Sequence, residues 1–256
     1  MTNEAAQQFD QLASLYEDMF TWSFRKHFEV PTALRVAGDV RNLTIMDFGC
    51  GGGGYTRLLK KGGAKQVVGY EPTPGMRDYA LKQARQNGLL DVSYISDLSA
   101  LPRDLAGKFD LLLSIYVLPY ATGKEKLDAM CAEKASLIRP GGRFVAVTIN
   151  PDLHPDSQYY KRYGLSFSPD DPKKESYGDG SRLRLELDYH GYTGSVHAWY
   201  WKHHSVEQAL EQANIHSICW HRLEMQPNHR KRRNVPDDLR PYQDQPHAIV
   251  IEGVRG

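Results

Sequence analysis

The sequence has little cysteine, no long apolar run and almost no excess of charge of either sign. Its three cysteines, Cys50, Cys131 and Cys219, are odd in number and form no Cys-x-x-Cys pair. This pattern argues against a disulfide framework and against a zinc site. No window approaches the roughly 18 apolar residues that a membrane span requires, and residues 1–29 lack an apolar stretch of signal-peptide length. We therefore expect a cytoplasmic protein with no metal and no membrane partner.

The charge balance excludes a strong electrostatic field over the whole molecule. Basic residues number 32 and acidic residues 31, which leaves a net charge of +1, so nothing in the overall charge would hold a nucleic acid backbone. The short basic run at residues 229–233 is typical of a solvated loop. With 41% apolar and 25% charged residues, the chain has the composition of a globular protein. We expect a small-molecule substrate, no nucleic acid partner, and a monomer or homodimer.

Short apolar runs alternate with helix-like segments from Leu43 onward. This rhythm predicts βαβ units and a parallel sheet. The predicted fold class is α/β, a Rossmann-like doubly wound seven-stranded mixed sheet with an antiparallel last strand. The predicted strands are residues 44–48, 66–70, 92–95, 109–115, 143–149, 215–223 and 248–252, and the predicted helices among them are residues 55–61, 75–86, 124–138 and 206–213.

The regions on either side of this core have a different texture. Residues 1–42 carry apolar residues at helical spacing and predict an N-terminal helical lid. Within the core, residues 43–150, Pro140-Gly141-Gly142 is expected to end the preceding helix. Residues 151–204 predict a substrate-side insertion with a β-hairpin, because 182–190 and 195–201 alternate on either side of a glycine-containing turn. Residues 205–256 are expected to complete the core sheet.

A glycine cluster follows the first predicted strand directly and precedes a predicted helix. Glycine is needed at such a turn because a ligand must approach the backbone closely. The cluster matches Gly-x-Gly-x-x-Gly at Gly49, Gly51 and Gly54, so a dinucleotide is an alternative. Asp47 stands at the mouth of the turn, where a carboxylate would repel a pyrophosphate and attract a ligand bearing an ammonium and a sulfonium. The charge favours S-adenosylmethionine.

Acidic residues also follow the second and third predicted strands. Glu71 ends the second, about 20 residues after the glycine cluster, where a carboxylate accepts hydrogen bonds from the ribose of either nucleotide ligand. Asp97 and Leu98 follow the third strand. There Asp97 would accept a hydrogen bond from an adenine amino group, and Leu98 would flank the adenine ring. Met76 would lie against the same ring or fill the core.

The motifs occur in a fixed order: Asp-x-Gly-x-Gly-x-Gly from Asp47, then Glu71, Asp97 before Leu-Pro, Phe109-Asp110, and Leu137 to Arg143. Over residues 5–150 this order resembles the class I S-adenosylmethionine-dependent methyltransferases. The resemblance implies S-adenosyl-L-methionine as cofactor and assigns a role to each motif. It places Gly49, Gly51 and Gly53 at the amino-acid portion, Glu71 at the ribose, Met76, Asp97 and Leu98 at the adenine, Ser114 to Tyr116 near the methyl group, and Tyr16, in the lid, over the cofactor.

The acceptor side is expected to be aromatic. The residues predicted near its mouth are Tyr116, Tyr120, Asn150, Tyr163, Tyr189, His190, Trp199 and Trp201. A pocket lined by aromatic side chains suits a planar heteroaromatic acceptor. An equal alternative is that these side chains only pack the hairpin onto the sheet. The candidate catalytic residues are Tyr116, Asn150, Tyr189 and His190, with His190 as a general base. Asn150 would orient the acceptor or cap the turn before Pro151.

The second half resembles a small-molecule subgroup that acts in specialised metabolism. The similarity lies in Leu118 to Ala121, Thr148 to Pro151, and Tyr163-Gly164. The subgroup includes N-methyltransferases of azapteridine formation and enzymes that close the aminobutyl part of the cofactor into an azetidine amino acid. The leading function is therefore methyl transfer to N or O of a small metabolite. A cyclase or lyase that consumes the same cofactor, or a non-catalytic binder, is the alternative.

Overall fold

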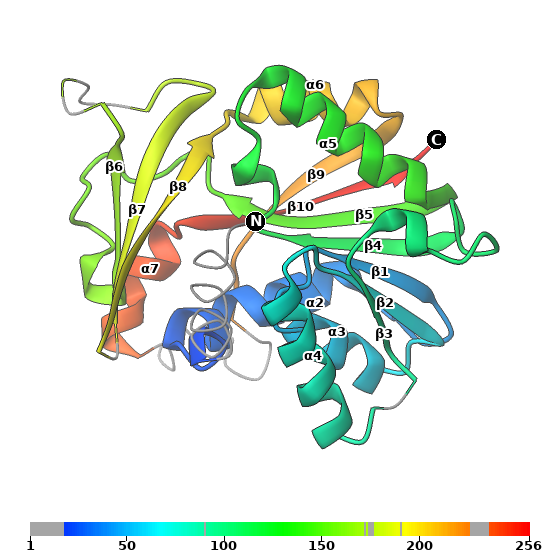
Figure 1. Ribbon diagram of the computed structural model, residues 1–256. Helices are drawn as coiled ribbons and strands as arrows, with labels where there is room; N and C mark the ends of the chain where they lie inside the picture. Colours follow the sequence, from blue (N-terminus) through cyan, green and yellow to red (C-terminus); the bar gives the residue numbers. More distant parts are fainter. Residues whose placement is uncertain (1–17, 90, 172, 174–176, 190, 226–235) are drawn as a thin grey trace.

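The computed structural model describes residues 18–256 except 90, 172, 174–176, 190 and 226–235. Its centre is a seven-stranded sheet in the order β3-β2-β1-β4-β5-β10-β9 (Figure 1). Neighbouring strands from β3 to β5 are parallel, whereas β10 is antiparallel to both β5 and β9. The predicted mixed sheet with an antiparallel last strand is confirmed. The strands are β1 Thr44–Phe48, β2 Gln66–Tyr70, β3 Ser93–Ile95, β4 Phe109–Ile115, β5 Ile138–Ile149, β9 Ile215–Arg222 and β10 Ala248–Arg255.

Helices cover both faces of this sheet, as the near-continuous apolar composition of its central strands requires. Successive residues of one strand point to opposite faces, so Ile45 joins the apolar cluster under one set of helices and Met46 joins the other. On one face lie α2 Val30–Ala37, α3 Gly54–Lys61 and α4 Pro74–Gln86; on the other lie α5 Lys124–Leu137 and α6 His203–Gln212 (Figure 1). None of the helices in the described part of the chain is long and apolar enough to cross a membrane.

The strand order reverses at β1 and β4, and we call the region at the carboxyl ends of these two strands the crevice. The chain runs outward from β1 to β2 and β3, and then returns to the other side of β1 as β4. Such a reversal leaves the loops after the two central strands on opposite sides of a gap, which is where ligands bind in open α/β sheets. The glycine cluster follows β1, and Tyr116 follows β4.

A second, three-stranded antiparallel sheet contains the predicted hairpin. Its strands are β6 Leu165–Pro169, β7 Ser181–Tyr189 and β8 Tyr192–Tyr200, in that order. The sequence predicts no strand in 151–180, because β6 offers only two apolar residues, Leu165 and Phe167, in alternation. Both are buried in the same apolar cluster as α2 and β5, so tertiary packing sets this strand.

The helix before Pro140-Gly141-Gly142 ends one residue before the predicted end, and Gly141 has the predicted left-handed conformation with a φ of 73°, but the next strand begins earlier than predicted. Helix α5 ends at Leu137 and β5 begins at Ile138, so the segment lies within the strand. Phe109 of β4 pairs with Ile138 whereas Leu111 pairs with Arg143, and the extra residues of β5 therefore bulge out of the ladder. A Cβ on Gly142 would lie 2.9 Å from the Phe109 carbonyl oxygen, so glycine is required by close approach.

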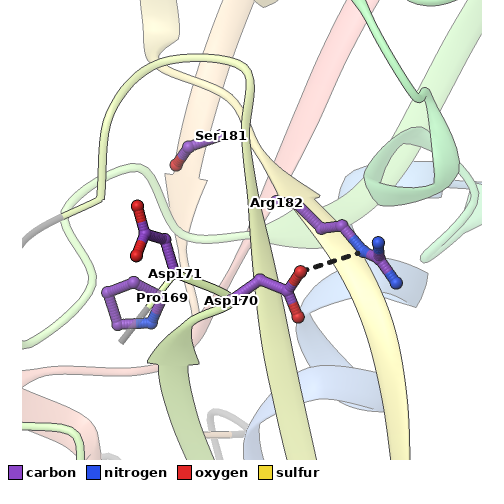
Figure 2. Close-up of a pocket in the computed structure, with 5 residues that line it drawn as sticks. All are labelled: Pro169, Asp170, Asp171, Ser181 and Arg182. Carbon is purple, nitrogen blue, oxygen red and sulfur yellow. Dashed lines mark ion pairs between the residues drawn. The ribbon is translucent and has the colours of Figure 1, made fainter. Parts of the chain in front are cut away.

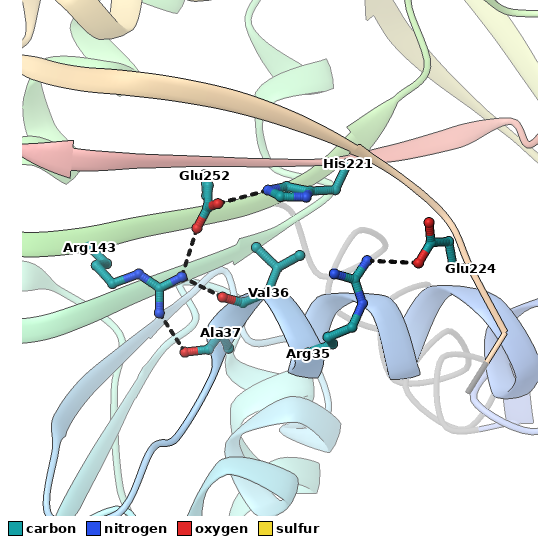
Figure 3. Close-up of polar contacts among 7 residues, drawn as sticks. All are labelled: Arg35, Val36, Ala37, Arg143, His221, Glu224 and Glu252. Carbon is teal, nitrogen blue, oxygen red and sulfur yellow. Dashed lines mark hydrogen bonds and ion pairs between the residues drawn. The ribbon is translucent and has the colours of Figure 1, made fainter. Parts of the chain in front are cut away.

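Helix α2 is fixed to the sheet at its C-terminal end. Arg143 of β5 donates to the carbonyl of Ala37 at 2.8 Å and to that of Val36 (Figure 3). Glu252 of β10 accepts from Arg143 at 2.7 Å and pairs with His221 of β9 at 2.8 Å. The guanidinium thus bonds carbonyls that a helix end leaves without partners. A π-helical turn, Arg25–Glu29, leads directly into α2, so the same anchor holds that turn.

The division of the chain at residues 42, 150 and 204 stays a prediction. The first two boundaries fall just before β1 and just after β5, whereas residue 204 lies inside α6, which begins at His203. The helix begins earlier than predicted because Asp179 bonds its first turn: the Asp179 carboxylate accepts from the Lys202 N–H at 2.7 Å and from the Ser205 hydroxyl at 2.5 Å.

Candidate functional site

The turn after β1 has the backbone of a ligand-binding loop. Gly49, Gly51 and Gly53 have φ angles of 75°, 51° and 74°, a region that side chains disfavour. A Cβ on Gly49 would lie 2.5 Å from Val117 Cγ2, so Gly49 is required by packing against the segment after β4. A Cβ on Gly51 would meet nothing within 4 Å. Gly51 is therefore the point at which this turn offers bare backbone to open space.

Asp47 lies beneath this turn with its carboxylate buried. It is 1% exposed, and its Oδ2 accepts a hydrogen bond of 2.6 Å from the Thr56 hydroxyl. Burial, with a smaller contribution from the nearby charge of Glu71, raises the pKa of Asp47 to about 6. A buried carboxylate with a raised pKa gains from a cationic ligand. The position fits the ammonium that the sequence predicts.

Glu71 connects the glycine turn to the end of β2. Its Oε2 accepts from the Gly51 N–H at 3.0 Å and its Oε1 from the Thr73 N–H at 2.9 Å. A carboxylate oxygen has two acceptor sites, so each oxygen retains one for a ligand hydroxyl. The predicted ribose contact at Glu71 is thus compatible with its hydrogen bonds.

The three residues predicted at the adenine differ in their surroundings. Asp97 is exposed after β3 and accepts from the Ser99 N–H at 2.8 Å, which caps a 3-10 turn at Leu98–Ala100. Leu98 is half-buried, and Met76 of α4 is 4% exposed. Met76 therefore has the burial of a core residue, whereas Asp97 and Leu98 are accessible. Their contact with adenine stays a prediction.

The end of β4 contains two unusual residues. Ser114 is fully buried, and among the described residues its hydroxyl has no hydrogen-bond partner. Tyr116 has a φ of 54°, which is uncommon for a residue with a side chain and concentrates at functional sites. Its neighbour Val117 is the residue that faces Gly49. The two loops therefore meet across the crevice.

Tyr116 belongs to a buried network that the sequence does not predict. Its hydroxyl lies 2.5 Å from Glu29 Oε2 and 3.1 Å from His247 Nε2. Glu29 Oε1 pairs with Arg25 Nε at 2.7 Å and accepts from the Tyr55 hydroxyl at 3.3 Å. The Tyr242 hydroxyl lies 2.9 Å from His247 Nδ1. Five segments of the chain thus converge on one cluster.

Burial sets the charge of this cluster. Burial, with a smaller contribution from the positive charge of Arg25, lowers the pKa of His247 to about 3, so the imidazole is neutral at physiological pH. It raises the pKa of the Tyr116 phenol well above its usual value, and so does the charge of Glu29. The one sequence signal that could have found the cluster is Arg25 and Glu29, two opposite charges at i, i+4 among apolar neighbours.

Asn150 holds the backbone beside His247. Its side-chain Nδ2 donates to the Pro246 carbonyl at 2.9 Å, and its Oδ1 accepts from the Asp152 N–H at 3.0 Å. Its own N–H donates to the His247 carbonyl at 2.8 Å. These bonds correspond to the capping alternative for Asn150, and a role in orienting an acceptor stays a prediction.

The remaining predicted aromatic residues are divided between packing and the surface. Tyr163 and Trp201 are buried, and the Tyr163 hydroxyl donates to the Asp238 carbonyl at 2.9 Å. Trp199 is half-buried, whereas Tyr120 is 46% exposed close to the end of β4. Of the other predicted site residues, Tyr16 and His190 lie outside the described residues, and so does the side chain of Tyr189.

A small cavity occurs in the second sheet, apart from this crevice. It is lined by Pro169, Asp170, Asp171, Ser181 and Arg182 and measures about 170 Å³ (Figure 2). Arg182 Nε lies 3.5 Å from Asp170 Oδ2, so an ion pair occupies part of its wall. Pockets for drug-sized ligands measure roughly 300–1,000 Å³. This cavity is too small for a nucleoside cofactor.

The region that forms the crevice matches a known family. Residues 45–142 match the family described as "Methyltransferase domain". Ubiquinone biosynthesis O-methyltransferase from Agrobacterium fabrum is 30% identical over 114 residues, which cover 44% of this chain and 44% of that protein. The protein of the same name from Coxiella burnetii is 33% identical over 107 residues, covering 41% and 43%. The chain therefore aligns with less than half the length of these curated relatives.

Solved structures share the fold over most of the chain. An S-adenosylmethionine-dependent methyltransferase from Mesorhizobium loti has a TM-score of 0.60 at 19% identity, covering 88% of this chain and 96% of its own. Magnesium protoporphyrin IX methyltransferase from Synechocystis PCC 6803, solved with bound SAH, has a TM-score of 0.53 at 19% identity, covering 89% and 80%. Likeness at this identity concerns the fold alone. The fold extends beyond the matched residues to nearly all of the sheet.

Proposed function

We propose that this chain, whose residues 45–142 are a domain of the class I S-adenosylmethionine-dependent methyltransferase superfamily, transfers a methyl group from S-adenosylmethionine to a small molecule. The superfamily is the one predicted from the sequence, and S-adenosylmethionine is its cofactor. The observation that carries the proposal is the turn at Gly51, which is open to space and donates to the Glu71 carboxylate, with the buried carboxylate of Asp47 at the end of the preceding strand. That arrangement suits a cationic nucleoside and disfavours a pyrophosphate.

The residues of the crevice fit this cofactor. Asp47 would hold the ammonium, the backbone at Gly51 would lie along the amino-acid portion, and Glu71 would accept from the ribose. The hydroxyl of Ser114, without a partner among the described residues, offers one more hydrogen bond in a buried position, where a polar group without a partner is costly. When bound, the cofactor supplies an electrophilic methyl group.

The protein's part in the reaction is to position and desolvate the acceptor. Methyl transfer from a sulfonium is an in-line displacement, which gains most from a nucleophile held about 3 Å from the methyl carbon in a dry site. Tyr116, after β4, would face the acceptor, with the exposed ring of Tyr120 nearby. Two aromatic side chains suit a planar acceptor. The names of the relatives, which are O-methyltransferases, favour a hydroxyl.

An incubation assay tests the proposal. Purified protein is mixed with S-adenosylmethionine, with and without small phenols, catechols and heteroaromatic amines as acceptors. We expect S-adenosylhomocysteine only when an acceptor is present. Methylthioadenosine without an acceptor would instead indicate a cyclase or lyase. Calorimetry provides the second measurement: binding of S-adenosylhomocysteine without turnover would indicate a binder, and binding of a nicotinamide dinucleotide in its place would contradict the proposal.

A further inference from the structure

We propose that Tyr116, Glu29 and His247 form a directional proton relay that removes the proton from a hydroxyl acceptor. The inference rests on the proposed methyl transfer and deepens it, because a relay of this kind specifies an acceptor that must lose a proton. Tyr116 would be the catalytic residue, in contact with the acceptor. Glu29 and His247 would act through Tyr116 as positioning residues, with Glu29 as the final site of the proton.

The hydrogen bonds of the cluster are compatible with one order of protons. Glu29, paired with Arg25 at 2.7 Å, is an acceptor, so the Tyr116 hydroxyl donates to it across 2.5 Å. A phenol has one proton, and therefore Tyr116 must accept from His247, whose Nε2 carries the proton. Neutral imidazole has one N–H, so His247 Nδ1 accepts from the Tyr242 hydroxyl. Every donor in the cluster thus points toward Glu29.

This order leaves Tyr116 one unused acceptor site. The phenol oxygen has two lone pairs, and His247 occupies one of them. Tyr116 is half-buried, whereas Arg25, Glu29, Tyr242 and His247 are all buried. Of these five residues, Tyr116 alone has both the free acceptor site and a side chain that is not fully buried.

The reaction written through this relay balances in atoms and charge. The acceptor oxygen forms its bond to the methyl carbon while the carbon–sulfur bond breaks, and that electron pair stays on sulfur. The acceptor proton moves to Tyr116 Oη as the Tyr116 proton moves to Glu29 Oε2. The positive sulfonium and the negative carboxylate are neutralised in the same step, and Glu29 later returns the proton to water. Because the Tyr116 phenol loses its own proton as it takes up the proton of the acceptor, it stays neutral throughout.

Stability alone is a weak reason for this arrangement. A buried ion pair is often no more stabilising than apolar residues of similar volume. The structure nevertheless keeps Arg25 and Glu29 buried on a π-helical turn and holds Tyr116 at a φ of 54°. Both features are costly and concentrate at functional sites. The groups that face the relay are Arg25 and Tyr55 at Glu29, and Tyr242 and Tyr160 at His247.

The proton order is testable without any acceptor. Nitrogen-15 spectra of the histidine side chains, with the signal of His247 identified by its loss in His247→Gln, report which nitrogen carries the proton. We expect the proton on Nε2, with no titration between pH 5 and 8. In Glu29→Gln the amide oxygen must face Arg25, so the amide NH₂ faces Tyr116 and reverses the chain. The His247 proton should then move to Nδ1. A proton on Nδ1 in the unaltered protein, or titration near pH 6.5, would overturn the proposal.

The relay also predicts that Tyr116 and Tyr55, which both donate a hydrogen bond to Glu29, differ in their effect on kcat. With S-adenosylmethionine and 3,4-dihydroxybenzoate as the probe, we expect Glu29→Gln and Tyr116→Phe to lower kcat about 100-fold. The loss should shrink toward pH 10, where the probe ionises in solution. Tyr55→Phe removes a hydrogen bond to Glu29 that lies off the proton path, and we expect kcat within about threefold of the unaltered protein. Unchanged binding of S-adenosylhomocysteine by calorimetry shows that each variant is folded.

The outcomes separate the relay from the function on which it rests. If the unaltered protein methylates the probe and Glu29→Gln is equally active, the relay is wrong and methyl transfer stands. If the protein methylates aniline but no hydroxyl, methyl transfer again stands and the inference about the acceptor is wrong. If no probe yields S-adenosylhomocysteine, the proposed function fails for these acceptors, and the His247 spectra still decide the proton order.

Discussion

The two halves of the crevice are built in different ways. On the proposed cofactor side, Asp47, Gly51 and Glu71 lie within 25 residues of chain and have hydrogen-bonding groups left for a ligand. Asp47 is a buried carboxylate bonded to the neutral Thr56, Gly51 has open backbone, and Glu71 has free acceptor sites. On the acceptor side, Glu29, Tyr116 and His247 come from distant segments and already bond one another. One half retains free hydrogen-bonding groups, as the proposed cofactor requires, and the other already bonds itself, as the proposed relay requires.

The largest expected effect is on the open backbone of the cofactor side. In Gly51→Ala, the new methyl group occupies the space that we assign to the cofactor, and the affinity for S-adenosylhomocysteine should fall about 100-fold, or roughly 3 kcal/mol. Gly88→Ala is the matched control, since Gly88 also has a positive φ, of 70°, with nothing within 4 Å. Both variants should lose similar stability, about 1–2 kcal/mol. Equal affinities in calorimetry would contradict the assignment of Gly51.

The next prediction concerns Asp47, where affinity and stability should change in opposite directions. Asp47→Asn keeps an acceptor for the Thr56 hydroxyl but removes a buried charge. We expect about 30-fold weaker cofactor binding. Because the pKa of Asp47 is raised from 3.8 to about 6, its ionisation disfavours folding, and the variant should gain up to about 3 kcal/mol of unfolding free energy at pH 8. Denaturant titration checks the gain, and a loss of stability would show that the charge has a partner in the folded protein.

The two halves should also respond oppositely to acid. The pKa of His247 is lowered to about 3, so the unfolded chain binds that proton first and stability falls as the pH drops from about 6.5 toward 3. Asp47, with a raised pKa, binds its proton first when folded, and its contribution to stability rises as the pH drops from about 6 to 4.

These contributions partly cancel in the unaltered protein, so Asp47→Asn should lose stability in acid more steeply, by up to about 1.4 kcal/mol per pH unit. Urea titrations between pH 7 and 4 measure both slopes. Parallel slopes for the two proteins would mean that Asp47 keeps its ordinary pKa when folded.

The smallest expected effect is at Ser114. Its hydroxyl is fully buried without a hydrogen-bond partner among the described residues, so Ser114→Ala should raise the free energy of unfolding by about 1 kcal/mol. Cofactor binding should weaken about threefold, or roughly 0.7 kcal/mol, which lies at the lower end of the net contribution of one hydrogen bond. Tyr242→Phe, which deletes a hydroxyl that is bonded, should instead cost about 1 kcal/mol. If Ser114→Ala also destabilises, then the hydroxyl has a partner in solution.

The difference between the halves explains what the sequence could predict. The turn at Asp47 to Gly53 and the carboxylate of Glu71 follow directly from strand ends, and a local pattern is enough to find them. Glu29 and His247 are brought to Tyr116 only by the packing of α2 and by the position of β10 beside β5. No spacing of residues in the sequence indicates that these three side chains are in contact. Asn150 was found by its place after β5, and its bond to the Asp152 N–H is the cap given as an alternative, but its bond to the Pro246 carbonyl, remote in sequence, was not foreseeable.

The same reasoning applies to the fold. The core strands carry continuous apolar runs and were predicted within a few residues, whereas β6 has too few residues to show a period and depends on neighbours that are remote in sequence. At Pro140 to Gly142 the residues indicated the helix end correctly, but not the bulge of β5 that the Phe109 carbonyl borders. Local signals predict a turn, and only the assembled sheet decides which kind it is.

The anchor formed by Arg143 has a consequence for engineering the acceptor range of this protein. It ties the last carbonyls of α2 to β5 and β10, so the turn that carries Glu29 has little freedom to shift for a larger acceptor. Room for bulkier compounds would have to come from Tyr120 and the strands β6–β8. Remodelling that wall would leave the electrostatics beneath Tyr116 as they are.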